Sequence, residues 1–474
     1  KKNKRVLLIN ENYSYDQFYN DTIFYFNFFK KYLRKKDVIA VSLNYSKDYL
    51  NIIFAAQKNG NIVTFINPNA PKSEKEFLIK NSKSKLFISK DKLFKSKFKI
   101  LNNLCIYFFS DNFNSKIKKN DVFIIYTSGT TSRPKGVILT IDSISSNINA
   151  ISQDLKFKNK DSTIIFSPPH YAMAYSQILT CMLNQMSFIL ISSGFKFPGS
   201  ILDKIIMHKI NVINLSISSF RILYPIIKKK KTLLKNIRLI MSGGMQMTKE
   251  NIYEYKKIFN KATIVNFYGC TENSPRISHF HVDLKKLKEH KNIIPVGKTL
   301  KGVKINIIRR NENDKFGKIF ISGTSLMRDY LLENNELKKK FKNNWFNTGD
   351  IGYIDKNQNI FLMGREDDSF RVGHEKLCPE EIEPIIKKNL KLKSDVIVGK
   401  LKNKILDWEP VLVTSRSDYK KNRKSLKNLK KNLNNYLVNY KIPSRVIALD
   451  NMPKTLYGKI DRKKINEIIQ KKKI

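Results

Sequence analysis

Several features that would assign the chain to a familiar class are missing from its 474 residues. The four cysteines include no Cys-x-x-Cys pair, which argues against a disulfide framework or zinc motif and is typical of a reducing cytoplasm. No apolar run reaches 18 residues, so the sequence predicts no transmembrane helix. The basic start is followed by too few apolar residues for a signal peptide. We therefore expect a cytoplasmic protein.

Acidic residues are scarce as well, because 89 Lys and Arg stand against 40 Asp and Glu, for a formal net charge of +49. A nucleic-acid-binding protein would gather this charge on one domain or patch. Residues 366–474 hold 27 Lys and Arg against 14 Asp and Glu, about the same excess per residue as the rest of the chain. The charge therefore reflects general composition, and we expect no nucleic-acid partner.

The chain exceeds the length at which a single hydrophobic core stops growing, so we expect its apolar residues to form more than one packed core. Strand patterns alternate with helix patterns near the start of the chain. We expect Gly60 to end the first helix and Ser73 to cap the second, and this rhythm predicts an α/β fold with a mostly parallel sheet. The predicted strands are 36–44, 61–69 and 85–89, and the predicted helices are 45–60 and 73–82.

The same alternation continues through the next 200 residues. A strand ends near Tyr126, another covers 136–140, and Asp142 is expected to cap a helix with one apolar face. After GREDDS the pattern changes to a smaller α+β unit with strands at 396–401 and 410–415. We predict an N-terminal domain of residues 1–364 and a C-terminal domain of residues 365–474. Ligand groups should gather where the parallel strands end in loops.

One loop is built like a phosphate site, in the stretch DVFIIYTSGTTSRPKGVILT that begins at Asp121. It is not a Walker loop, because Lys135 precedes Gly136, and Val137 stands where a hydroxyl residue is required. Small residues, hydroxyls and one lysine nevertheless suit an anion, because backbone N–H groups can converge on it. The alternative is a solvated turn between two strands.

Five motifs in register are more specific than that loop. Their order and spacing resemble the core motifs of the adenylate-forming superfamily, which includes acyl-CoA synthetases, aryl-CoA ligases, peptide-synthetase adenylation domains and luciferases. The resemblance covers about residues 38–465. It implies a large N-terminal AMP-binding domain with mostly parallel sheets flanked by helices, and a small mobile α+β lid domain. The motifs are YTSGTTSRPKG (126–136), NFYGCTE (266–272), NTGD (347–350), GREDD (364–368) and PKTLYGKIDR (453–462).

The resemblance implies a reaction in two steps, with ATP and Mg²⁺ and with coenzyme A as the acceptor. A carboxylate attacks the α-phosphate, pyrophosphate leaves, and a thiol captures the acyl-adenylate. Catalysis is then mainly placement and positive charge. The residues that would clasp the leaving phosphates are Thr127, Ser128, Gly129, Thr130, Thr131 and Lys135.

The other motifs imply positions for the nucleotide and the acyl carboxyl. Thr271 would contact the α-phosphate, and Glu272 would bind Mg²⁺ as a hard oxygen ligand. Asp350 would accept both ribose hydroxyls, and Arg365 would help to hold ribose and phosphate. The adenine and the acyl carboxyl would be bounded by Gly243, Gly244, Tyr268 and Gly269.

The resemblance places the last two roles in the smaller domain. Lys459 would bridge the acyl carboxylate and the α-phosphate, and Asp367 would be the hinge about which the domain rotates. The chain departs from the family pattern at Ser132, where glycine is more common. Arg371 replaces a usual lysine and His374 a usual glycine in RVGHEKLCPEEIE, which leaves the thioester step the less certain half-reaction.

The acid itself is suggested by the segment SPPHYAMAYSQILTCMLNQMSFILI, which matches the acyl-pocket region. It lacks the aspartate that binds an amino acid's α-ammonium in peptide-synthetase domains, and burying that cation unpaired would be costly. A fatty or aryl acid is favoured, and His170 is either a gate at the pocket wall or a hydrogen-bonded core residue. The predicted lining is His170, Tyr171, Met173 and Tyr175.

The acceptor stays open between coenzyme A and a separate acyl or peptidyl carrier protein. The chain ends soon after Lys459, so we expect no fused carrier domain, and coenzyme A is favoured. A protein that kept the fold and lost catalysis is the alternative from another class. The presence of Lys459, Asp350, Arg365 and Glu272 argues against it.

Overall fold

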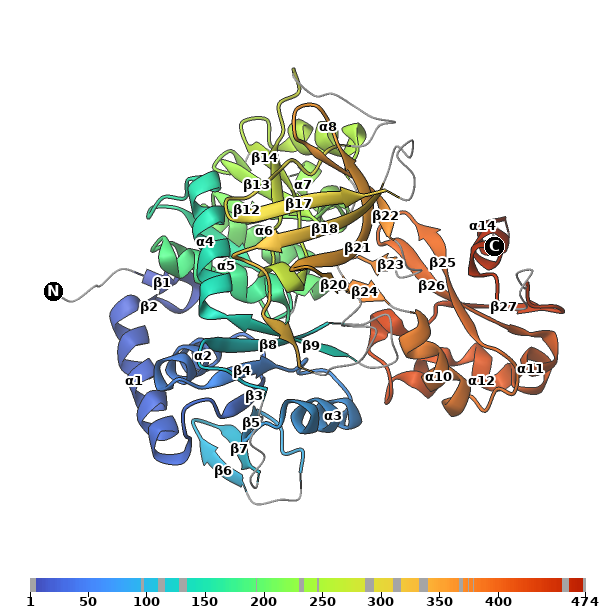
Figure 1. Ribbon diagram of the computed structural model, residues 1–474, viewed down its shortest axis with the longest axis horizontal. Helices are drawn as coiled ribbons and strands as arrows, with labels where there is room; N and C mark the ends of the chain where they lie inside the picture. The colour runs from blue at the N-terminus through green and yellow to red at the C-terminus, as the bar shows by residue number, and fades with distance from the viewer. Residues whose placement is uncertain are drawn as a thin grey trace. The chain divides into compact units, whose positions relative to one another are not determined.

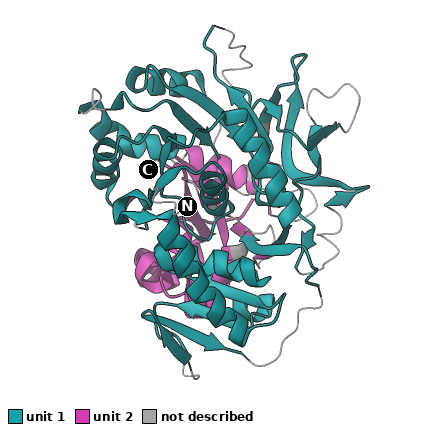
Figure 2. Ribbon diagram, turned by 90° about the vertical axis from the view of Figure 1, so that its left-hand side faces the viewer, with its two compact units in different colours: residues 1–68, 76–126, 136–364 teal, residues 69–75, 127–135, 365–474 magenta. Residues whose placement is uncertain are grey.

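The computed structural model describes the greater part of the chain. By contacts, the chain divides into two compact units, coloured separately in Figure 2. Unit 1 comprises residues 1–68, 76–126 and 136–364, and unit 2 comprises residues 69–75, 127–135 and 365–474. The described residues are 6–94, 98–109, 116–127, 134–192, 194–229, 234–244, 247–285, 294–309, 317–331, 340–365, 370–373, 375–377, 379–453 and 460–471.

An eight-stranded sheet contains the first strands that the sequence predicts. Strands β3, β4, β5 and β8 are parallel neighbours, and β6, β7 and β19 join the sheet antiparallel. In order across the sheet, the strands are β19 (Asp329–Tyr330), β9 (Lys135–Thr140), β8 (Asp121–Thr127), β4 (Ile62–Phe65), β3 (Val38–Ser42), β5 (Leu86–Ser89), β7 (Leu104–Phe108) and β6 (Phe98–Leu101).

The helices between these strands confirm the predicted alternation. Helix α2 (Lys47–Asn59) begins after Ser46, whose hydroxyl accepts a hydrogen bond from Tyr49 N, and it ends at Gly60 as expected. Helix α3 (Lys72–Ser82) begins one residue earlier than the sequence predicts. Ser73 therefore lies inside the first turn, and its predicted role as the cap is wrong.

A nine-stranded sheet forms the second layer of unit 1. It is parallel from β14 to β1, and β15, β16 and β2 are antiparallel edges. The order is β16 (Lys298–Thr299), β15 (Ser278–His281), β14 (Thr263–Tyr268), β13 (Leu239–Gly243), β12 (Val212–Asn214), β10 (Ser162–Ile165), β11 (Ser187–Leu190), β1 (Val6–Leu8) and β2 (Tyr13–Ser14).

Helices connect the strands of this sheet to one another and, through α1 and α4, to the eight-stranded sheet (Figure 1). The cap of α4 differs from expectation, because Thr140 accepts from Ser143 N while Asp142 lies in the first turn. A hydroxyl one residue before the helix reaches the free N–H groups, which the Asp142 side chain cannot do from inside the turn. The helices are α1 (Tyr15–Tyr32), α4 (Ile141–Leu155), α5 (Ala172–Leu183), α6 (Pro198–Met207), α7 (Ile217–Lys229) and α8 (Lys249–Ile258), with short 3₁₀ turns η1 (Ile9–Glu11) and η2 (Gly194–Lys196).

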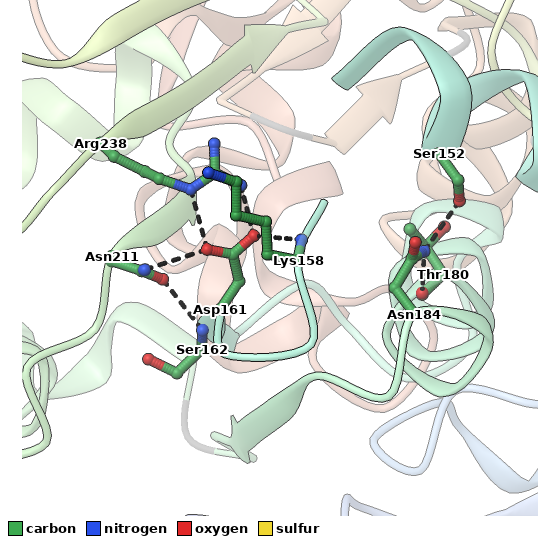
Figure 3. Close-up of polar contacts among 8 residues, drawn as sticks. All are labelled: Ser152, Lys158, Asp161, Ser162, Thr180, Asn184, Asn211 and Arg238. Atoms are coloured by element: carbon green, nitrogen blue, oxygen red, sulfur yellow. Dashed lines mark hydrogen bonds and ion pairs between the residues drawn. The ribbon is translucent and has the colours of Figure 1, made fainter. Parts of the chain in front are cut away.

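A buried carboxylate links the amino ends of β10, β12 and β13 in the nine-stranded sheet (Figure 3). Asp161, just before β10, accepts from Arg238 Nε at 2.8 Å, from Arg238 Nη2, and from Asn211 Nδ2 at 3.0 Å. Asn211 precedes β12 and Arg238 precedes β13. Because the three amino ends are fixed in register, the opposite, carboxyl ends of these strands are aligned as well.

A third sheet is antiparallel and is not anticipated by the sequence pattern. Burial alternates along β17, so one face packs and the other meets solvent, as antiparallel sheets allow. The prediction of mostly parallel sheets therefore holds for the first two sheets of unit 1. The strands are β17 (Val303–Ile308), β18 (Gly317–Gly323), β21 (Trp345–Ile354), β20 (Phe341–Lys342) and β22 (Ile360–Arg365).

Unit 2 contains an α+β fold built on strands β25 and β26, which confirm the two strands predicted there. Arg462 forms two hydrogen bonds to the Glu383 carboxylate, at 2.8 and 2.7 Å, which join α14 to α10. The strands are β23 (Phe370–Val372), β24 (Glu375–Leu377), β25 (Ile397–Asn403), β26 (Asp407–Ser415) and β27 (Arg445–Leu449); the helices are α10 (Pro379–Asn389), α11 (Arg416–Lys421), α12 (Arg423–Lys427), α13 (Leu429–Leu433), α14 (Arg462–Lys471) and the 3₁₀ turn η5 (Asn439–Lys441).

Candidate active site

The nine-stranded sheet brings three of the predicted segments to one edge. Strands β10, β13 and β14 are parallel members of this sheet, so their carboxyl ends lie on the same side. The segment 166–175 follows β10, Gly243 and Gly244 end β13, and residues 268–272 end and follow β14. Residues between 24 and 106 positions apart in sequence therefore surround one region at the end of the sheet.

Two of the predicted glycines are required by close packing at this edge. A Cβ atom on Gly243 would lie 2.4 Å from the Phe267 ring of the neighbouring strand. A Cβ atom on Gly269 would lie 1.8 Å from the carbonyl oxygen of Pro275. Neither position can hold a side chain without a shift of the backbone or of an aromatic ring, so the glycines fix the shape of the edge.

Tyr268 and Asp350, both predicted site residues, are in direct contact. The Tyr268 hydroxyl donates to Asp350 Oδ2 at 2.5 Å, and burial raises the pKa of Tyr268 well above its ordinary value, so the phenol keeps its proton. Asp350 N donates to Thr348 Oγ1, which itself donates to the carbonyl of Ile319. The carboxylate is thus oriented by the third sheet and presented to the end of β14.

Glu272 is held by the first sheet. Thr271 and Glu272 lie in the 3₁₀ turn η4 (Thr271–Asn273), where the Tyr330 hydroxyl donates to Glu272 Oε1 at 2.8 Å. Met327 N donates to the Glu272 carbonyl at 2.7 Å. Tyr330 belongs to β19, which pairs with β9, the strand that follows the phosphate-type loop in the chain.

The donor set around Glu272 fits a magnesium ion that is shared with phosphate. Mg²⁺ is commonly bound by one or two carboxylates together with substrate phosphates, and the Glu272 carboxylate supplies a hard oxygen. Within the described ranges, no cluster of three or more His, Cys, Asp or Glu side chains could hold a metal by itself. Protein residues of the described part would therefore share the ion with the nucleotide.

The phosphate-type loop and the predicted catalytic lysine are described only at their edges. Thr127 ends β8, and Lys135 begins β9 with a buried side chain. Arg365 ends β22, and nothing is described of its side chain. The predictions for Ser128, Gly129, Thr130, Thr131, Asp367, His374 and Lys459 lie outside the described residues.

The predicted acyl-pocket segment is anchored to α2 and to the residues just before it. Tyr45 and Tyr49 donate from their hydroxyls to the carbonyls of Ser167 and Pro169, both at 2.6 Å. The rings of His170 and Tyr171 lie 4.6 Å apart, edge to face. These contacts hold the turn that leads from β10 into α5.

The next pocket residues extend this wall into the interior. Tyr175 is buried against Phe123, with ring centroids 5.1 Å apart, and burial raises the pKa of its hydroxyl. Met173 is half-buried. The described residues offer the Tyr175 hydroxyl oxygen no hydrogen-bond partner. The surroundings of Tyr175 and Met173 are therefore mainly apolar and aromatic, and the assignment of this segment to an acyl pocket stays a prediction.

Arg276 is a residue of this wall that sequence reasoning missed. Its Nη2 donates to Met173 Sδ at 3.3 Å, and its guanidinium carbon lies 3.2 Å from the centroid of the Phe267 ring. The side chain is buried, with the residue only 3% exposed. The one available signal was a basic residue four positions after Glu272, in a stretch of otherwise apolar and small residues.

A carboxylate with two histidines lies behind Arg276. Asp154 Oδ2 accepts from His279 Nδ1 at 2.7 Å and from His281 Nε2 at 2.9 Å. Burial lowers the pKa of His279 to about 4, whereas the hydrogen bond to Asp154 raises the pKa of half-exposed His281. Burial alone would raise the pKa of Asp154, but the hydrogen bonds from the two histidines hold it well below its usual range.

This pair predicts a pH dependence of stability. The folded pKa of His279 lies below the unfolded value of about 6.5, so between about pH 4 and 6.5 the unfolded chain binds the extra proton and stability rises with pH. The loss on acidification is up to about 3 kcal/mol. We expect His279→Gln to flatten the fall in Tm between pH 7 and 4.5, measured by thermal unfolding.

The matched variant is His281→Gln, which removes a histidine from the same carboxylate. Its raised pKa contributes stability below the unfolded pKa, and this contribution is lost as pH rises. The fall in Tm on acidification should therefore become steeper in His281→Gln. Parallel Tm curves for the wild type and His279→Gln would contradict the assignment.

The chain is similar in sequence to known enzymes. A family model described as "AMP-binding enzyme" matches residues 1–331. The chain is 25% identical over 445 residues to a 2-succinylbenzoate–CoA ligase of Listeria monocytogenes, covering 92% of this chain and 90% of the relative. It is also 25% identical over 355 residues to a D-alanine–D-alanyl carrier protein ligase of Bacillus licheniformis, covering 73% and 70%.

A solved structure shows the same fold. A double mutant of the o-succinylbenzoate CoA synthetase from Bacillus subtilis, bound to its product analogue, matches with a TM-score of 0.80 at 20% identity. The match covers 98% of this chain and 96% of the other. In the part of the chain that the structure describes, no helix is both long and apolar enough to cross a bilayer.

Proposed function

Because the chain belongs to the family of AMP-binding enzymes, we propose that it uses ATP to join a carboxylic acid to a thiol, with AMP as a product. The observation that carries the proposal is the contact of Tyr268 with Asp350 at the edge that also holds Gly243, Gly244 and Glu272. These residues come from two motifs and one turn far apart in sequence. A nucleotide site requires such residues from separate parts of the chain to lie at the same end of the sheet.

The residues then have distinct tasks in the first half-reaction. The Asp350 carboxylate takes two ribose hydroxyl donors, for which a carboxylate has enough lone pairs even while it accepts from Tyr268. Thr271 orients the α-phosphate, and Lys135 with Thr127–Thr131 binds the departing pyrophosphate. Glu272 holds Mg²⁺, which neutralises phosphate charge when bound. Catalysis by these groups is placement and electrostatic stabilisation of the developing phosphate charge.

The smaller domain, residues 365–474, acts in this proposal as a mobile lid. Arg365 contributes to ribose and phosphate binding, and Lys459 bridges the acyl carboxylate and the α-phosphate. In unit 2, Asp461 N donates to the carbonyl of Pro453 at 2.9 Å, so the ends of the segment that contains Lys459 meet.

The acid is a fatty or aryl acid rather than a free α-amino acid. No aspartate in the segment 167–191 is available to pair with an ammonium group. The buried Arg276 cation beside Met173 would also repel such a group. An apolar body fits Tyr171, Met173 and Tyr175, with His170 at the entrance.

Coenzyme A is the acceptor that we favour. One relative is named as a CoA ligase and aligns over 90% of its own length, whereas the carrier-protein ligase aligns over 70%. A separate carrier protein is the alternative acceptor. A non-catalytic binding protein is disfavoured because Asp350, Glu272, Arg365 and Lys459 are all present.

We expect exchange of labelled pyrophosphate into ATP to require Mg²⁺ and a fatty or aryl acid, with free amino acids as poor substrates. The measurement is the exchange rate over a panel of carboxylic acids, with no acid as the blank. Addition of coenzyme A should then yield an acyl-CoA and AMP. A standard amino acid that outpaces every fatty and aryl acid would show the pocket assignment to be wrong.

A further inference from the structure

Arg276 is a buried cation to which the described residues give no counter-ion. Its Nε and Nη1 atoms are buried without a hydrogen-bond partner in the described part of the chain, and Nη2 meets only the Met173 thioether. No Asp or Glu of the described ranges forms an ion pair with it. A thioether sulfur is a weak acceptor, so three donor atoms of one guanidinium are poorly satisfied.

Such an arrangement is costly for folding. A buried charge without a partner destabilises the folded state by several kcal/mol, and a buried arginine is normally paired. Burial lowers the pKa of Arg276 to about 9, so the group is still protonated at neutral pH. Among the described residues, the face of the Phe267 ring is what compensates the charge. Folding thus buries a cation whose desolvation is not offset by a counter-ion among the described residues.

The backbone keeps Arg276 in this place. Its carbonyl accepts from Asn147 Nδ2 and from Asn273 Nδ2, each at 2.7 Å, and its N–H donates to Asn147 Oδ1. The side chain is therefore directed from a fixed backbone toward Met173. The His279 ring lies edge to face with the same Phe267, with ring centroids 6.4 Å apart, and its Nε2 is also buried without a partner in the described part.

The neighbours of Arg276 in the chain and in the fold indicate what this cation could bind. Arg276 lies four residues after Glu272, and Met173 belongs to the acyl-pocket segment after β10. The Arg276 guanidinium thus contacts the segment that, in the proposed function, surrounds the acyl group. Methionine is flexible and can yield its place to a ligand, which would expose the donors of Arg276 to a stronger acceptor.

We propose that the acid substrate carries a second carboxylate, remote from the one that is activated, and that Arg276 binds it. The substrate class is then a dicarboxylic acid with an apolar or aryl body. A carboxylate can accept two N–H groups of a guanidinium side by side and supplies the missing counter-charge. This inference rests on the proposed function, because it assumes that the segment 167–191 surrounds the acyl group.

The test uses pairs of acids in which a methyl group is replaced by a carboxylate. Suitable pairs are octanoate with octanedioate, 4-methylbenzoate with benzene-1,4-dicarboxylate, and shorter and longer homologues of each. Pyrophosphate exchange is measured for the wild type, Arg276→Met and Arg276→Lys. Arg34→Met, on the exposed surface of unit 1, is the control for the same substitution elsewhere.

In the wild type and in Arg34→Met, at least one diacid should exceed its matched monoacid in kcat/KM by about 10- to 100-fold, the scale of a charged hydrogen-bonded pair. In Arg276→Met this preference should disappear, because kcat/KM should fall for the diacid and not for its matched monoacid. Arg276→Lys should keep part of it. Thermal unfolding of Arg276→Met should give a Tm at or above that of the wild type, because the variant removes an unpaired buried charge.

A monoacid that equals or exceeds its diacid in every pair would overturn the inference while leaving the proposed function intact. Equal loss for both members of a pair in Arg276→Met and Arg276→Lys would also overturn it. Absence of exchange with every acid would instead contradict the proposed function itself.

Discussion

Replacement of Lys459 by alanine is expected to slow adenylation by on the order of 10²- to 10³-fold, the scale of removing one preorganised electrostatic group. Thioester formation from a supplied acyl-adenylate should stay close to the wild-type rate, because no pyrophosphate departs in that step. Single-turnover assays of each half-reaction measure the two rates separately.

A surface lysine of the same unit provides the control. Lys464→Ala, on exposed α14, removes the same charge and should leave both rates unchanged. Comparable losses of Lys459→Ala in both half-reactions would point to misfolding or to another role for the lysine, and would count against its assignment.

The second large effect is expected at Asp367, where proline should hinder the change between half-reactions. In the proposed function, Lys459 and the Arg371–His374 segment lie in the same small domain but would serve different half-reactions. The proposal therefore has this domain rotate about a hinge at Asp367. Hinges absorb their change in a few φ and ψ angles, and proline holds φ near about −65°. We expect Asp367→Pro to keep most adenylation while thioester formation falls by at least about tenfold.

The two half-reactions must again be measured apart, because the overall rate would hide the difference. Asp367→Ala is the matched control, since it removes the carboxylate but leaves φ free, and both of its rates should stay near those of the wild type. Unimpaired thioester formation in Asp367→Pro would refute the rotating-domain proposal for this chain.

The early strands and helices could be predicted because local sequence was sufficient for them. Alternating strand and helix patterns predicted β3, β4 and β5 with α2 and α3 between them. The residues that cap the individual helices were predicted less accurately. Thr140 rather than Asp142 caps α4, and Ser73 lies inside α3, because each helix begins earlier than the residue expected to cap it, and a side chain inside the first turn does not reach the free N–H groups.

The membership of the family also followed from sequence, because five short motifs each keep their order and composition along the chain. The roles of Lys459 and Asp367 remain predictions. The antiparallel third sheet escaped prediction, since β17, β18 and β21 pair across tens of residues and no local signal states which strands will meet.

Only the tertiary structure decided which of the candidate site residues meet and which side chains contact the segment 167–191. The Tyr268–Asp350 contact joins residues 82 positions apart, and the Arg276–Met173 contact joins residues 103 positions apart. In the sequence, Arg276 is one of 89 basic residues in a chain where most are solvated. Its meaning comes from burial at the end of a folded sheet, where desolvation makes a lone charge costly and therefore informative.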